Sequence, residues 1–565
     1  MTTTTTRRVP RHVIGFGLGL LVFLVAVLAM ARQSPAPEAT LSLRELHNTE
    51  FAAPPPRPST TTFVTSLWND FHGRPGDAFF ESLFSEQGGV LLIAFAVMLI
   101  VAFDFNQPRV SRHLELAALT IMGLLLFNIM RFFELLADPT YFWLMDLVFT
   151  GIVAMSIIWI VLALWRVRHP HTDAWMPNLS VRPLMVLTVL LLALNIWTAM
   201  THAPDDAGFY TNLGAQRLRE RGKMPYGDPL LTNSAGAGYG TLLYLGHLPF
   251  QLALNPTPLN DTQPTRDDLA AGAHYVLPPT LASQLTTISF HVLGVASIIT
   301  IGMQLATPAV GWALAALYCS SAYVLGVGGG TETIGGMTFI SHIAPPAVSM
   351  LAFAFLARPV LAGFLLVAAS MTVFFPALFF PAWLGYYWDR RPSMLSFIGG
   401  CVLGAVVFVV PTIALSQALP DHSVVSTVIK ESVGHHQGTD TYGLSTFGFW
   451  GQRGGIRDWF REPFVDGQFT TSPMFLITIG FAALMFFMAR QTRPWQLALI
   501  TATVGIIAQW SKIHGTGVYV NWYYPFLLIG ILAARPSAPV VPKSFEHGDH
   551  GAGPARRPML HSGSG

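Results

Sequence analysis

The sequence predicts an all-α, polytopic membrane protein. Of its 565 residues, 52% are hydrophobic and 11% are charged, whereas an ordinary soluble domain has about 25% charged residues. The hydrophobic residues form long runs, and short segments that contain Arg separate these runs. Because lipid offers the backbone no hydrogen-bond partners, such runs form helices. At about 20 residues for each span, and with one longer stretch divided in two, we expect about 14 transmembrane crossings.

The predicted spans follow from the length of each apolar run. Runs long enough to cross about 30 Å of hydrocarbon lie at 13–32, 88–104, 113–133, 142–165, 183–201, 284–306, 308–327, 340–357, 394–416, 473–489, 495–510 and 519–534. The first of them also has the order of a secretory signal peptide, but about 19 apolar residues are long for one, which favours an uncleaved anchor. The stretch 359–388 contains Pro376 and Pro381 and is basic at both flanks. Two short helices, in and back out, fit it better than one over-long helix.

The basic residues predict the orientation. Arg7, Arg8 and Arg11 precede the first run, which places the N-terminus in the cytoplasm by the positive-inside rule. Alternation from there brings every short basic loop to the cytoplasmic side, with Arg109, Arg112, Arg166, Arg168, Arg182, Arg358, Arg390, Arg391, Arg490, Arg493 and Arg535. The short loops on the other side, 134–141 and 328–339, contain no Lys or Arg. We expect a multi-pass protein of the cytoplasmic (inner) membrane with both termini in the cytoplasm.

The segments outside the membrane divide the chain into three parts. The predicted parts are an N-terminal module of four spans at 1–181 with a Pro/Thr-rich linker at 33–87, a membrane domain at 182–535, and a disordered cytoplasmic tail at 536–565. Two long loops of the membrane domain, 202–283 and 417–472, mix aromatic, glycine, acidic and basic residues. That composition is typical of a folded site, whereas the linker has the composition of an extended spacer.

The charge balance and the cysteines exclude two classes of function. The formal net charge is only +2, and the Lys and Arg residues are spread along the loops, so we expect no nucleic-acid binding. Both cysteines, Cys319 and Cys401, lie in apolar runs. They support neither a disulfide framework nor a cysteine metal site.

Two adjacent acids, Asp205 and Asp206, follow the span 183–201 directly. A helix is predicted from about 206 to 221, ending at Gly222. An Asp at a helix start caps free N–H groups, and one Asp is enough for that. Adjacent carboxylates repel each other, which favours a raised pKa and a general base in one of them. Capping and catalysis both remain open from these residues alone.

The residues that follow resemble a known family. After the two acids come the turn Gly222 to Tyr226 (GKMPY) and the element Tyr239-Gly240-Thr241, which leads into an apolar run. This order is similar to the first extracytoplasmic loop of the GT-C superfamily, the integral-membrane glycosyltransferases that use polyprenyl-phosphate-linked sugars. A departure is Thr241, where proline is usual in the family.

Further resemblance lies downstream, and the similarity covers about residues 182–535. The broken stretch 359–388, the polar Trp-Gly segment 439–451 and the aromatic segment 512–525 resemble elements of the mannosyltransferase-like members. The resemblance implies an inverting transfer of sugar from a polyprenyl-phosphate donor to a lipid, glycan or protein acceptor at the outer face. It implies Asp205 as general base, with Asp206 as second choice, because the acceptor hydroxyl must lose a proton.

The other residues of the expected site are those that would bind substrate. The leaving phosphate needs positive charge, and the candidates to supply it are Arg217, Arg219, Lys223, His342, Lys512 and His514. Three tyrosines complete the expected substrate-binding residues: Tyr226, Tyr239 and Tyr523. The basic group near 217–223 also suits attraction to anionic membrane lipids. No cofactor is assigned. A divalent metal stays open, for instance at His435, His436 and Asp440, although adjacent histidines rarely aim at one ion.

Two other functions remain open. A transporter or channel would use the glycine-rich loop 328–339 as a re-entrant segment, but few ionisable residues lie within the spans of 284–534. A non-catalytic subunit of a larger membrane complex would use the four-span module 1–181 to bind its partner.

Overall fold

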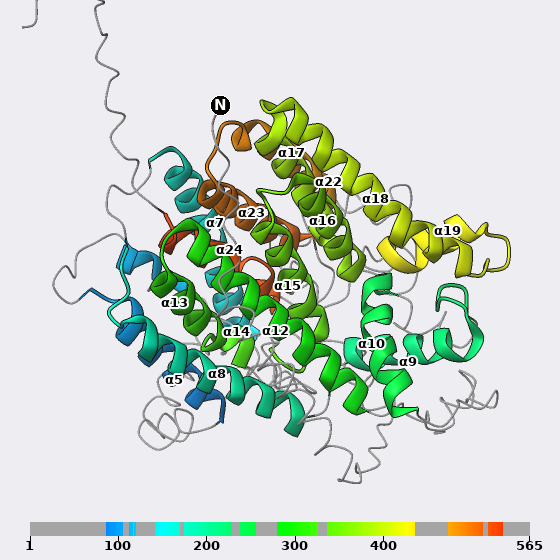
Figure 1. Cartoon of the computed structure of the whole chain (residues 1–565), viewed down its shortest axis with the longest axis horizontal. Helices are drawn as coiled ribbons and strands as arrows, with labels where there is room; N and C mark the ends of the chain where they lie inside the picture. The colour runs from blue at the N-terminus through cyan, green and yellow to red at the C-terminus, as the bar shows by residue number, and fades with distance from the viewer. Residues whose placement is uncertain are drawn as a thin grey trace, which may run out of the picture.

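A computed structural model describes residues 86–104, 112–116, 118–119, 142–169, 175–202, 204, 206–228, 238–255, 280–325, 336–434, 473–511 and 518–534. Every regular element in these segments is a helix (Figure 1). Four stretches are long and apolar enough to cross a membrane: Gly151–Arg168, Val181–Thr201, Leu281–Leu305 and Arg391–Leu415. The all-helical class is therefore confirmed, and these spans indicate a multi-pass membrane protein. The number of about 14 crossings stays a prediction.

The helices begin and end close to the predicted bounds. The first half of the chain forms α5 (Glu86–Ala102), α7 (Phe142–Arg168), α8 (Val181–Thr201), α9 (Asp206–Arg221), α10 (Thr241–Leu254), α12 (Thr280–Leu305), α13 (Pro308–Cys319) and α14 (Ala322–Leu325). The second half forms α15 (Ile340–Ala354), α16 (Pro359–Val373), η4 (Phe375–Phe379), α17 (Phe380–Trp388), α18 (Arg391–Leu415), α19 (Val424–Ile429), η5 (Lys430–Gly434), α22 (Pro473–Ala489), α23 (Pro494–Trp510), η6 (Val518–Trp522) and α24 (Tyr524–Leu532). The predicted run 13–32, most of 113–133, the linker and the tail lie outside the described residues.

Two predicted helices are shorter in the structure. The run 519–534 is divided into the 3-10 helix η6 and the nine-residue α24. The apolar run 308–327 was expected to be continuous, but α13 ends at Cys319 and the short α14 begins at Ala322. The hydroxyls of Ser320 and Ser321 between them donate to backbone carbonyls three residues earlier. Hydroxyl groups that bond to the local backbone in this way compete with the helical ladder, which explains why an apolar run need not be one helix.

The proline-rich stretch 359–388 folds as two short helices, as predicted. α16 ends at Val373, and Phe374 has a positive φ of 61°. Pro376 lies in the first turn of η4, and α17 then continues to Trp388. Both α15–α16 and α17–α18 are joined by short turns that contain Arg, so the pair 359–388 leaves and returns to the same end of the molecule.

The packing of α16 on α18 is the most extensive helix contact in the described residues. Glycines make this close approach feasible. A Cβ added at Gly400 would overlap the carbonyl oxygen of Val360, and one at Gly363 would overlap that of Phe397. Gly404, one turn further along α18, lies against Val367. In lipid, where apolar side chains gain little by associating, small residues that let helix backbones approach are the usual basis of helix pairing. We call Gly363, Gly400 and Gly404 the glycine seam.

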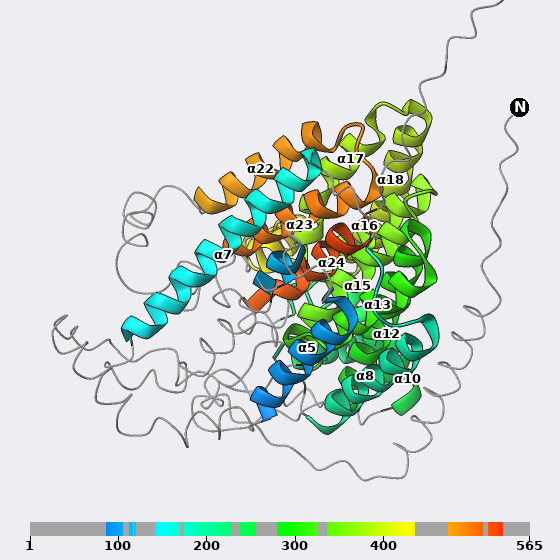
Figure 2. The ribbon, with the colours of Figure 1, turned by 90° about the vertical axis from the view of Figure 1, so that its left-hand side faces the viewer.

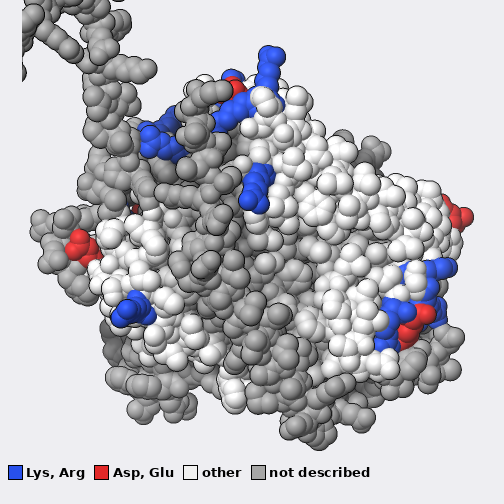
Figure 3. Space-filling view, in the orientation of Figure 1, with Lys and Arg blue, Asp and Glu red and all other residues white. Residues whose placement is uncertain are grey.

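Hydrogen bonds gather the basic turns at one end of the helical core. Arg490, in the α22–α23 turn, donates to Asp389 of the α17–α18 turn at 2.8 Å. Gln496 of α23 donates to the carbonyl of Val167 near the end of α7 at 2.7 Å. Figure 2 shows α7 running along the α22–α23 pair at this flank. We call this the basic end, and in Figure 3 blue atoms gather at the upper edge, over α17 and the start of α18.

The opposite end holds the described parts of the two long loops. The backbone N–H of Gly240 donates to Thr372 at the end of α16 at 2.7 Å, and that of Met224 donates to Leu415, the last residue of α18, at 2.9 Å. α16 and α18 therefore run from the basic end to what we call the α9 end, at the lower right of Figure 1. The arrangement agrees with the predicted alternation of loops. Which end faces the cytoplasm stays a prediction.

Candidate functional site

The helix α9 begins at Asp206 and ends at Arg221, as its sequence predicts. Gly222 follows with φ +64°, a left-handed conformation that glycine adopts without a steric penalty. Asp205 lies outside the described residues, and of Asp206 the structure describes the backbone but not the side chain. Of the two acids, the structure therefore places the backbone of Asp206 in the first turn of α9.

The turn after α9 is held by a buried ion pair. The guanidinium of Arg217 donates to both oxygens of Asp228, with Nε–Oδ2 at 2.9 Å and Nη2–Oδ1 at 3.3 Å. The two side chains are 2% and 4% exposed. Such a pair stabilises only when both partners stay in place, because loss of one leaves a buried charge. Arg217 was predicted to bind substrate, and the structure shows its charge engaged within the fold.

The same turn is fixed by a distant acid that the sequence did not single out. The backbone N–H of Gly227 donates to Oε2 of Glu431 at 2.6 Å, across 204 residues. Glu431 is buried and belongs to the π-helix η5, a conformation that is rare and frequent at functional sites. A Cβ at Gly227 would overlap the carbonyl of Gln417, so the closeness of the 417 segment also requires glycine there.

Two of the three tyrosines of the predicted site, Tyr226 and Tyr239, are in contact in this region. The hydroxyl of Tyr226 donates to the carbonyl of Tyr239 in a short hydrogen bond. Burial raises the pKa of Tyr226 far above its usual range, so the hydroxyl stays protonated and can donate. The neighbouring Gly240 packs so closely on Met371 that a Cβ would overlap that residue's carbonyl. The Tyr-Gly element therefore joins α10 to the end of α16, and glycine at 240 is required by contact.

The remaining basic candidates of this segment are Arg219, near the end of α9, and Lys223, just after it. Arg219 donates to the carbonyl of Gln251 at 3.2 Å and is within 3.4 Å of the Glu220 carboxylate. Lys223 is exposed and donates to Gln417 at 3.4 Å. Asp206 and Arg219 are thirteen positions apart on one helix, which is about 20 Å at 1.5 Å for each residue. A single small group cannot contact both.

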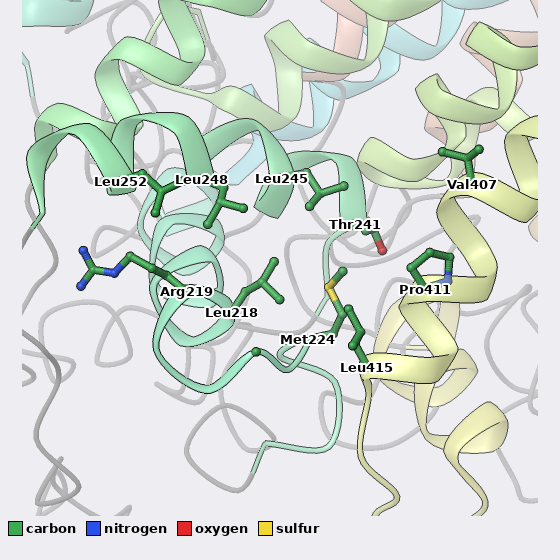
Figure 4. A pocket seen from close by; sticks show the side chains of 11 residues that line it. Leu218, Arg219, Met224, Thr241, Leu245, Leu248, Leu252, Val407, Pro411 and Leu415 are labelled. Atoms are coloured by element: carbon green, nitrogen blue, oxygen red, sulfur yellow. The ribbon is translucent and has the colours of Figure 1, made fainter.

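An apolar groove of about 500 Å³ lies between α9, α10 and α18. Figure 4 shows the leucines of α10 along one wall and residues of α18 across from them. The lining residues are Leu218, Arg219, Gly222, Met224, Thr241, Leu245, Leu248, Leu252, Val407, Pro411 and Leu415. Along α10 the groove extends from Leu252, near Arg219, to Thr241, next to the Tyr-Gly element. It has the shape and chemistry to hold a hydrocarbon chain.

The candidates from the other loops lie near the start of α15. His342 is buried, with its ring between those of Phe339 and Tyr519, at 4.9 and 4.8 Å between centroids. Its carbonyl accepts from the amide of Asn521 at 2.8 Å. Tyr523 follows this amide and is 1% exposed. The structure thus brings 339–342 and 519–523 together. Lys512 and His514 lie outside the described residues.

The candidate metal ligands are the histidines and acids of the late loop. The residues that the structure describes contain no group of three or more His, Cys, Asp and Glu side chains able to hold an ion. His435, His436 and Asp440 lie outside these residues, as does Glu332 in the glycine-rich loop.

Asp228 and Glu431 are the two site residues that sequence reasoning did not assign. Asp228 lies two residues after the turn that the resemblance identified. Its closeness in sequence to three arginines was a signal that it could pair with one of them. Glu431 had no local signal, because its partner is a backbone group in another loop. Comparisons of the chain with family models, curated proteins and solved structures found no match.

Proposed function

We propose that the chain is a membrane glycosyltransferase of the GT-C type, which moves a sugar from a polyprenyl-phosphate donor to an acceptor hydroxyl at the α9 end. The observation that carries the proposal is the apolar groove between α9, α10 and α18. It opens at the side of the helical core, next to the loop in which the resemblance predicts the catalytic acids. A donor with a long hydrocarbon chain needs such a groove, whereas a water-soluble donor does not.

The geometry supports one arrangement of the donor over another. Arg219 is about 20 Å along α9 from Asp206, so a phosphate bound at Arg219 would leave its sugar far from the predicted base. We therefore assign Arg219 and Lys223 to the boundary with lipid headgroups, and we place the donor phosphate outside the groove, nearer to the first turn of α9 than Arg219 is. α9 also packs against α15, whose first turn carries His342. We assign the neutralisation of the leaving phosphate to His342, Lys512 and His514.

The proposed reaction follows from these assignments. The carboxylate of Asp205, or of Asp206, takes the proton of the acceptor hydroxyl as its oxygen bonds to the anomeric carbon of the sugar. The bond from that carbon to the phosphate oxygen breaks, and its electron pair leaves with the polyprenyl phosphate. The positive charge of His342, Lys512 and His514 stabilises that leaving group. Attack opposite to the leaving group inverts the anomeric carbon.

The test is transfer from polyprenyl-phosphate hexoses and pentoses by membranes that contain Asp205→Asn or Asp206→Asn. We expect at least a hundredfold loss of transfer in one of them, the size of a lost general base. Asp421→Asn is the matched control, because Asp421 is exposed at the same end and has a φ of 62° that Asn tolerates. Full activity in both acid variants would contradict the proposed base.

A second measurement separates the enzyme from its rivals. Leu248→Trp narrows the groove, and we expect it to weaken binding of a fluorescent polyprenyl phosphate without unfolding the protein. If the parent binds polyprenyl phosphate but transfers no sugar from any donor, the proposal fails in favour of a lipid transporter or a non-catalytic subunit.

A further inference from the structure

A second groove, of about 520 Å³, lies between the first half of α16 and α18, towards the basic end. Its walls are mainly apolar, and its two polar side chains are Arg358 and Ser396. The apolar lining consists of Pro359, Val360, Leu361, Phe364 and Leu403. Val360 and Leu403 are 48% and 49% exposed, so the groove faces outward from the helical core. It is distinct from the groove beside α9, because the two lie towards opposite ends of α18.

Arg358 differs in its pairing from three other arginines of the helical core. Arg217 and Arg490 have carboxylate partners, and Arg219 has Glu220. The exposed Arg358 guanidinium lies 5.9 Å from the centre of the Phe355 ring and forms no ion pair with the described residues. A cation at the mouth of an apolar groove attracts an anion that also carries hydrocarbon.

The position of Arg358 along the core corresponds to a headgroup boundary. Val360 packs against Gly400, while α18 begins nine residues before Gly400, about 13 Å further towards the basic end. Arg358 therefore lies roughly 10 Å inside the start of α18. Its turn is held there by Tyr387, whose hydroxyl donates to the carbonyl of Leu356 at 2.6 Å. Arg358 thus has the apolar walls of the groove on one side and the basic turns of the helical core on the other. A lipid phosphate binds in such surroundings.

We propose that this groove binds an anionic phospholipid of the leaflet at the basic end. One acyl chain lies along Val360, Phe364 and Leu403, and the phosphate contacts the Arg358 guanidinium and the Ser396 hydroxyl. Within the described part of the chain this hydroxyl forms no hydrogen bond, so it is available as a donor. A free phosphate would gain nothing from the apolar walls, which is why the lipid is the occupant.

The first experiment measures headgroup preference in the full chain. Native mass spectrometry of the detergent-purified protein would compare dioleoyl-phosphatidylglycerol with dioleoyl-phosphatidylcholine at equal concentrations. We expect about fivefold tighter binding of the anionic lipid, the size of one Arg contact at a membrane surface. Arg358→Gln should abolish this preference. Arg391→Gln, the same charge change at an exposed residue of the same end, should retain it. Equal loss in both variants would overturn the proposal in favour of diffuse attraction.

The second experiment locates the chain and separates lipid from free anion. A phosphatidylglycerol with a diazirine on its acyl chain should crosslink to peptides that contain 359–364 and 396–403, and Leu403→Trp should reduce this crosslinking at least threefold. In phosphatidylcholine, the melting temperatures of Arg358→Gln and Leu403→Trp should equal that of the parent, which would show that both variants are folded. Crosslinks confined to other helices, or full competition by glycerol phosphate, would overturn the assignment.

Discussion

The glycine seam and the α9–α10 unit are stabilised by different kinds of contact. In the seam, α16 and α18 touch backbone to backbone at Gly363 and Gly400, and few polar groups take part. In the α9–α10 unit, the turn after α9 is held by the pair Arg217–Asp228 and by Glu431. The first kind of contact works inside lipid, where polar groups are costly. The second fixes a buried non-helical turn, because only hydrogen bonds can satisfy its backbone groups, which have no helical partners.

The two regions tolerate different kinds of substitution. The seam depends on the volume of its side chains, so an added methyl group should matter and a changed charge nearby should not. The turn depends on specific partners, so the removal of one atom or one charge should matter more than a change in volume. A site that must hold a substrate in one geometry benefits from the second kind of contact, since partners fix position as well as contact.

The largest effect is expected from Arg217→Ala. It leaves the buried Asp228 carboxylate without its ion-pair partner, and such a loss costs about 3–5 kcal/mol of unfolding free energy. The measurement is reversible unfolding in mixed detergent micelles, followed by circular dichroism. The control is the double variant Arg217→Met with Asp228→Leu, which removes both charges and should recover most of the loss. A double variant as unstable as the single one would show that the charges are not the cause.

Gly400→Ala tests the seam. The new Cβ would overlap the Val360 carbonyl, so we expect overpacking to lower the unfolding free energy by about 1–3 kcal/mol. Gly399 is the matched control, because a Cβ there meets no atom within 4 Å. The Gly399→Ala variant should stay within about 0.5 kcal/mol of the parent. Equal stability of the two variants would mean that α16 and α18 are further apart than described.

Glu431→Gln is expected to have a smaller effect. The amide keeps an oxygen that accepts from Gly227, but the hydrogen bond is no longer charge-assisted, which costs about 1 kcal/mol. The same unfolding measurement applies, together with proteolysis of the turn 222–228, which should become faster. If the Gln variant is as stable as the parent, the carboxylate charge is not needed to hold the turn.

The smallest effect is expected from the exposed pair at the basic end. The hydrogen bond from Arg490 lowers the pKa of Asp389 below its ordinary value. The contribution of this group to stability is therefore present above the ordinary Asp pKa of about 4 and is lost as the pH falls through the lower folded value. Asp389→Asn should be slightly less stable than the parent at pH 7, and the difference should vanish in acid and in 1 M salt. A stability difference between the parent and Asp389→Asn that grows in acid would contradict a stabilising contribution from this ion pair.

Local patterns predicted most of the helices. The ends of α9 followed from the acids before it and Gly222 after it, and the break in 359–388 followed from its prolines. Both signals act within a few residues of the helix end, so they can be recognised from the sequence alone. The run 308–327 shows the limit, because two serines between apolar segments ended α13 early.

By itself the sequence determined the membrane class, the positions of the four long apolar helices and the concentration of charge in short turns, since length and hydrophobicity are local properties. Only the tertiary structure decided that Arg217 pairs with Asp228, that Glu431 holds a turn 204 residues away, and that α10 and α18 enclose a groove. These contacts depend on which helices pack together. In this protein that packing is decided by close approaches such as Gly400 on Val360, which no single segment specifies.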